Sequence, residues 1–77
     1  MNKQRRIDLK DAIRCMESAK YIIKDVKSKE EDAFDNLPEN LQCSNRGCDM
    51  EENIDEMDEV LDKLDDIIDQ VNDIIFC

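Results

Sequence analysis

An unbroken heptad repeat in the second half of the chain constrains the fold more than any other feature of the sequence. Apolar residues recur at alternating intervals of four and three, and neither Pro nor Gly occurs from residue 48 onward. This spacing is typical of an amphipathic helix with a coiled-coil seam. The seam consists of Met50, Ile54, Met57, Leu61, Leu64, Ile68, Val71 and Ile75. It predicts one continuous helix over residues 46–75.

A second apolar stripe runs beside this seam. Val60, Ile67 and Ile74 each follow a seam residue by three positions. A two-stranded coiled coil needs only the narrow seam, so the wider band favours burial against more than one neighbour. We therefore expect the seam and the second stripe together to form the core of a homodimer or a larger homo-oligomer.

A less regular helix is predicted over residues 5–33. On a wheel of 3.6 residues per turn, one face carries Leu9, Ala12, Ile13, Met16, Ala19, Ile22, Ile23 and Val26, with Phe34 near its centre. Residues 1–29 hold nine basic and four acidic side chains, whereas residues 30–77 hold two basic and seventeen acidic ones. Because these charges are opposite, we expect the two helices to fold against each other.

The connection between the helices has several turn signals. Pro38 cannot continue the first helix, since it lacks an amide hydrogen. Asn36 and Glu39 have capping-box spacing, which predicts a short helical turn over residues 37–42. Ser44 or Asn45 can then cap the second long helix. The predicted loop spans residues 35–46.

These features define one domain, residues 1–77, of the all-α class. We expect an antiparallel two-helix hairpin with a capped loop, which assembles into a four-helix-bundle dimer or a higher homo-oligomer. Gly47, at the start of the second long helix, permits close approach by backbone or ligand.

Composition excludes several classes of function. The 77 residues include no His and a single Gly, which argues against histidine-based catalysis and Gly-rich phosphate loops. A hairpin this thin offers no closed pocket for tuning a carboxylate, so we expect no enzymatic activity and no cofactor. A net charge of −10 and only three aromatic residues disfavour direct nucleic-acid binding. No apolar run suits a signal peptide or a membrane span, so the chain is expected to be soluble and intracellular.

The four cysteines leave more than one interpretation open. Cys15 and Cys77 are expected to lie too far from the loop to pair with Cys43 or Cys48 within one hairpin. Cys43 and Cys48 could pair with each other, or form a four-cysteine zinc site with the same residues of a second chain. No CxxC motif is present, so we expect reduced cysteines and no metal.

The loop is the candidate binding surface. It is longer than the two to eight residues that usually connect bundled helices, and long ordered loops often carry function. Arg46 is the only basic residue between Lys29 and Lys63. It could pair with Asp35 or Asp49, or it could bind an anion at the start of the second long helix. The candidate ligand- or partner-binding residues are Asp35, Asn36, Gln42, Ser44, Arg46 and Gly47.

The same segment carries a resemblance. Residues 34–50 follow the pattern FDNLPExLQxSxRGxxM, and this pattern is similar to that of a family of small uncharacterised helical proteins of bacteriophages and prophages of Gram-positive gut bacteria. Cys43 and Cys48 lie outside the pattern. The resemblance implies a viral, non-enzymatic protein of the host bacterial cytoplasm and favours small effectors that neutralise host defence.

Three functions remain open. The first is a homo-oligomeric anti-defence protein that sequesters a host immune protein or a small signalling nucleotide through the loop. The second is an acidic nucleic-acid mimic that blocks a basic enzyme. Its phosphate-like charges would be Asp55, Asp58, Glu59, Asp62, Asp65, Asp66, Asp69 and Asp73. The third is a structural, self-assembling bundle.

Overall fold

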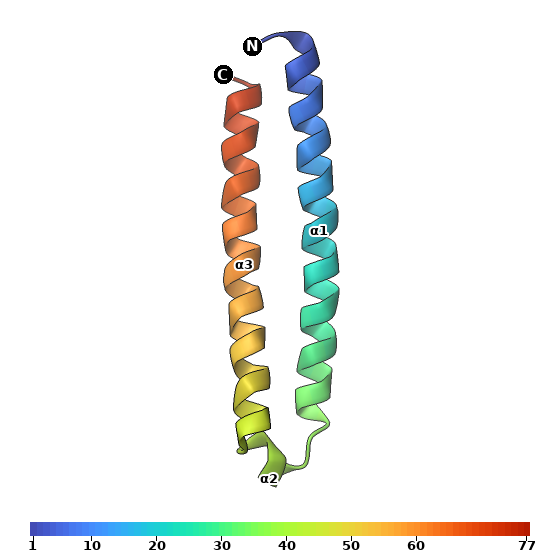
Figure 1. Ribbon diagram of the computed structural model, residues 1–77, viewed down its shortest axis with the longest axis vertical. Coiled ribbons are helices and arrows are strands. Elements are labelled where there is room, and N and C mark those ends of the chain that lie inside the picture. The colour runs from blue at the N-terminus through green and yellow to red at the C-terminus, as the bar shows by residue number, and fades with distance from the viewer.

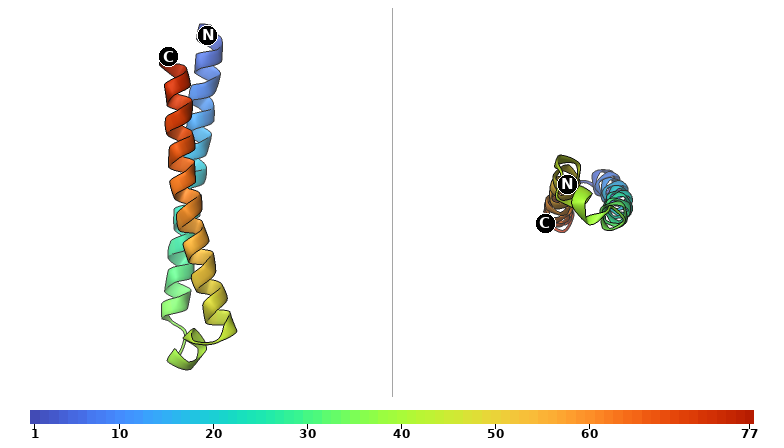
Figure 2. Two further views of the ribbon diagram at one scale, coloured as in Figure 1. Left: turned by 90° about the vertical axis from the view of Figure 1, so that its left-hand side faces the viewer. Right: turned by 90° about the horizontal axis from the view of Figure 1, so that it is seen from below.

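The computed structural model describes all residues from 1 to 77 and contains three helices, α1 (Lys3–Asp35), α2 (Glu39–Gln42) and α3 (Asn45–Ile75). Helices α1 and α3 run antiparallel, with α2 at the closed end of the hairpin and both termini at the open end (Figure 1). Perpendicular views show α1 and α3 side by side along their length (Figure 2). The rod measures 58 × 15 × 12 Å. The predicted all-α class and the long helix pair are confirmed, and each long helix begins and ends within two residues of its expected bounds.

Side chains cap the start of both long helices. The carboxamide oxygen of Asn2 accepts a hydrogen bond from the Arg5 amide at 2.8 Å. Of the two predicted caps of α3, Ser44 and Asn45, the structure forms the one at Ser44, whose hydroxyl oxygen accepts from the Gly47 amide at 3.4 Å. Such caps satisfy amides that have no partner inside the helix.

The predicted capping box of Asn36 and Glu39 is wrong. Asn36 instead terminates α1, and its amide donates to the Asp32 carbonyl at 3.0 Å. Its backbone has helical angles, whereas an N-cap residue needs an extended conformation. The N-cap position of α2 is occupied by Pro38, and no side chain caps that short helix.

The two long helices pack through matching heptads. In α3 the eight predicted seam residues are buried or partly buried, and Leu61, Ile68 and Ile75 are the most enclosed. The α1 side of the seam also follows intervals of four and three and consists of Leu9, Ile13, Met16, Lys20, Ile23, Lys27, Glu30 and Phe34. The best-packed cluster surrounds Ile13, Ile68 and Ile75 in the open half of the rod.

The predicted apolar face of α1 is only partly correct. Ala12, Ala19, Ile22 and Val26 were expected to be covered, but all four are exposed. The cause is the 3.5-residue repeat of α3, which a partner helix can follow only by adopting the same period. Lys20 and Lys27 thereby replace apolar residues in the seam.

The expected oligomer core also divides into two parts. The eight seam residues of α3 pack against α1 of the same chain and are used in the hairpin itself. Val60, Ile67 and Ile74 do not contribute to that packing, and they remain 46%, 47% and 45% exposed. Only this second stripe is left for a second copy.

Candidate functional site

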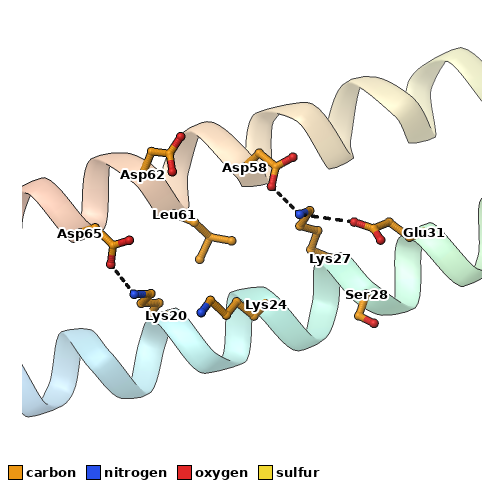
Figure 3. A pocket seen from close by; sticks show the side chains of 9 residues that line it. All are labelled: Lys20, Lys24, Lys27, Ser28, Glu31, Asp58, Leu61, Asp62 and Asp65. Atoms are coloured by element: carbon orange, nitrogen blue, oxygen red, sulfur yellow. Dashed lines mark hydrogen bonds and ion pairs between the residues drawn. The ribbon is translucent and has the colours of Figure 1, made fainter.

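One side of the hairpin carries a ladder of charges across the two helices, here called the charged face. It forms a shallow groove of about 400 Å³ with Leu61 at its base. The other lining residues, drawn in Figure 3, are Lys20, Lys24, Lys27, Ser28, Glu31, Asp58, Asp62 and Asp65. Three lysines oppose four carboxylates, so the face is nearly neutral.

Two ion pairs connect the helices on this face. Lys20 pairs with Asp65, and Lys27 pairs with Asp58 and, at 3.4 Å, with Glu31 (Figure 3). The lysine side chains are only 23% and 24% exposed, because their stems lie in the seam while the ammonium groups reach out to the carboxylates. Lys27 lies seven residues after Lys20 in α1, and Asp58 lies seven residues before Asp65 in α3. Both pairs therefore correspond to the same alignment of the two antiparallel helices.

The role of Lys20 and Lys27 in the seam was not predicted from the sequence. Lys20 and Lys27 stand seven residues apart and continue the interval pattern of Leu9, Ile13 and Met16. That periodicity is a signal in the sequence, although the pattern of apolar residues alone does not contain it. Polar residues at such seam positions specify register in helical pairs.

The inter-helix pairs predict a specific dependence of stability on pH. A hydrogen bond to Asp65 raises the pKa of Lys20 above its ordinary 10.5, and a hydrogen bond to Asp58 does the same for the pKa of Lys27. A raised pKa in the folded state gives stability that is complete below pH 10.5 and is lost as pH rises through the folded-state pKa. The melting temperature of wild type should therefore fall more steeply above pH 10.5 than the melting temperature of Lys27→Met. Parallel curves for the two proteins would contradict this role.

The opposite side of the hairpin is apolar and uncovered. Facing residues lie in three layers at the register of the ion pairs, Ala12 with Ile74, Ala19 with Ile67, and Val26 with Val60. We call these residues, together with the adjoining Ile22, the apolar face. Ile22 is 66% exposed and Val26 is 47% exposed. A groove of about 380 Å³ runs along its closed-end part and is lined by Val26, Glu30, Asn53, Glu56, Met57 and Val60.

The loop at the closed end is held by internal contacts. The Gln42 amide nitrogen donates to the carbonyls of Phe34 at 3.2 Å and Leu37 at 3.1 Å. Gly47 is buried against the backbone of Gln42, and a Cβ atom on Gly47 would lie 2.2 Å from the Gln42 carbonyl oxygen. The close approach expected at Gly47 is therefore to backbone.

The candidate loop residues thus separate into two groups. Asn36, Gln42, Ser44 and Gly47 are engaged in ending one helix and starting the next. Asp35 and Arg46 are exposed and belong to none of the ion pairs. The alternative in which Arg46 pairs with Asp35 or Asp49 is not formed, so its guanidinium faces solvent at the start of α3.

The cysteines form no disulfide in the structure. Cys15, Cys43, Cys48 and Cys77 are exposed thiols, and no group of three or more Cys, Asp and Glu side chains within the chain is placed to hold a metal ion. None of the helices combines the length and the hydropathy that a membrane-spanning segment requires.

No protein-family model, curated protein or solved structure matches the chain. The function therefore has to be inferred from three features of the hairpin: the paired charged face, the uncovered apolar face and the solvent-facing Arg46 on an ordered loop.

Proposed function

We propose that this protein is a non-enzymatic binding protein that works as a homodimer or a higher homo-oligomer. The observation that carries the proposal is the apolar face, which extends through three layers of the hairpin with its large residues about half exposed. Soluble proteins rarely leave a continuous apolar strip uncovered, and such strips mark interaction sites. A second hairpin on this face would complete a four-helix bundle.

We further propose that the assembled protein is a bacteriophage effector of the host bacterial cytoplasm that sequesters or inhibits a host component. The loop supports this role, because Gln42, Ser44 and Gly47 fix its shape while Arg46 remains free. A free guanidinium binds carboxylates and phosphates in a bidentate manner. The target is therefore a host immune protein or a small signalling nucleotide, which makes the protein an anti-defence factor. The resemblance in residues 34–50 points the same way.

The grooves support a binding role rather than catalysis. Each is shallow, and two of the three lysines of the charged face, Lys20 and Lys27, are paired with carboxylates of Asp65, Asp58 and Glu31. Catalytic carboxylates need an enclosed environment that shifts their protonation, and a pair of helices provides little enclosure. We therefore propose no enzymatic activity, no cofactor and no metal.

Substitution of Arg46 tests the binding role. Wild type, Arg46→Ala and the control Lys63→Ala would each be incubated with bacterial lysate and repurified. Mass spectrometry would then identify co-purifying proteins and heat-released small molecules. We expect at least a tenfold loss of one specific ligand for Arg46→Ala and none for Lys63→Ala, with helix content unchanged in both. Identical profiles for all three proteins would leave the loop without a binding role.

An acidic mimic of nucleic acid is the second candidate, because the charge is concentrated at one end. Residues 25–60, the closed half of the hairpin, hold thirteen acidic and three basic side chains, a net charge of −10. A salt-sensitive complex with a basic nuclease or polymerase that survives Arg46→Ala would favour mimicry over loop-mediated sequestration. Assembly without any host partner would favour a structural bundle.

A further inference from the structure

We propose that the second copy covers the apolar face in an antiparallel orientation, so that the two loops lie at opposite ends of the dimer. This inference rests on the proposed self-association and specifies its geometry. A face that pairs with itself around a two-fold axis allows two arrangements. In one, the loops share an end and α1 contacts α3 of the second copy. In the other, the loops are opposed and each helix contacts its own counterpart.

The layers of the apolar face match those of a second copy. Its three layers are evenly spaced, with Ala19 and Ile67 in the middle one. From Ala12 to Val26 the face is about 21 Å long at 1.5 Å per residue, and it is two helices wide, which gives about 400 Å² per copy. This is about half of the roughly 800 Å² per partner of a stable interface, so the polar residues flanking the face must supply the rest. An axis through the middle layer would stack Ile67 on Ile67 and Ile74 on Val60.

The edge of the face distinguishes the two orientations. With opposed loops, Ile22 of one copy lies within one residue of the height of Cys15 of the other, and Asp8 lies within one residue of the height of Lys29. An apolar contact is thereby flanked by opposite charges. With loops at one end, Ile22 would instead lie at the height of Lys63. That arrangement would bring an ammonium group against the most exposed aliphatic residue of the face.

The distribution of net charge favours the same orientation. The closed half carries −10, so the remaining residues of the open half carry a net charge of zero. Loops at one end would bring two strongly acidic halves together, whereas opposed loops set each acidic half against a neutral one. Like charges repel most within the Debye length, about 8 Å at physiological salt, which is close to the spacing of packed helices.

The orientation determines how a ligand is bound. Opposed loops place the two Arg46 side chains about 60 Å apart, because each lies 21 residues from Ile67, at the axis, and α3 rises 1.5 Å per residue. No small molecule spans that distance, so each loop would bind its own partner. The dimer would be bivalent, with two ligands per two chains.

Distances between spin labels test the proposal. A variant that keeps Cys43 as its only cysteine (Cys15→Ser, Cys48→Ser and Cys77→Ser) would carry one nitroxide at the closed end. All four cysteines are exposed, so the hairpin should tolerate these changes. We expect a label-to-label distance of about 60 Å or more, whereas loops at one end would give about 25 Å or less, within two helix diameters.

A second variant that keeps only Cys15 provides the matched control. Cys15 lies near the proposed axis, so its labels should be about 10–25 Å apart in either orientation. A short distance from both variants would overturn the opposed orientation and leave the dimer intact. No dipolar signal from either variant, with a monomer mass by light scattering, would overturn the self-association on which this inference rests.

Discussion

Replacing Ile67 with Asp is expected to convert the assembly into folded monomers of 9.0 kDa. Ile67 occupies the middle layer of the apolar face and takes no part in the seam. In the assembly, each carboxylate would be buried against an apolar neighbour, at a cost of about 4 kcal/mol or more. That cost corresponds to about a 1,000-fold weaker dimer. Light scattering measures the mass, and circular dichroism should show unchanged helix content.

Two other variants delimit this result. Ser18→Asp adds the same charge at the same height of the rod but on the outward side of α1, and it should leave the assembly unchanged. Leu61→Asp places the charge in the seam, where only 7% of Leu61 is exposed, and it should unfold the hairpin itself. An Ile67→Asp protein that keeps the wild-type mass would show that the apolar face is not the interface.

Gly47→Ala is expected to destabilise the hairpin, although the same change inside a free helix would stabilise it by about 1 kcal/mol. A Cβ atom here would lie 2.2 Å from the carbonyl oxygen of Gln42 and 2.6 Å from its carbonyl carbon. Both are backbone atoms, so the connection between α2 and α3 must shift. Overpacking of this kind costs about 1–3 kcal/mol, which lowers the melting temperature by roughly 5–20 °C in a domain of this size.

The adjacent Cys48→Ala is the control for this prediction. Cys48 is exposed in the same helical turn, so its replacement should change stability by less than about 0.5 kcal/mol. A melting temperature of Gly47→Ala equal to or above that of wild type would show that the contact with Gln42 is not tight.

The parts of the fold that depend on local pattern were predictable from sequence. The interval pattern from Met50 to Ile75 predicts α3, Pro38 predicts the break, and Ser44 is one of the two predicted caps, the other being Asn45. Each of these depends on residues only a few positions apart. The effects are the periodicity of apolar residues, the missing amide hydrogen of proline, and the capping of a helix by a nearby side chain.

The rest depends on how the two helices meet. The seam of α1 accepts Lys20 and Lys27 because Asp65 and Asp58 stand opposite them, and no property of α1 alone reveals those partners. The same register turns Ile22 and Val26 outward. In the loop, the contact of Gly47 with the Gln42 backbone arises only once α2 folds under α3. Gln42, a candidate for ligand binding, is consequently occupied by Phe34 and Leu37.

Sedimentation equilibrium of the wild-type protein tests the central claim most directly. The proposed self-association rests on the uncovered apolar face, in which Val60, Ile67 and Ile74 are about half exposed. At micromolar concentration and physiological salt we therefore predict a mass of twice the 9.0 kDa of one chain, or a multiple of that value. A helical monomer of 9.0 kDa throughout the micromolar range would contradict the account.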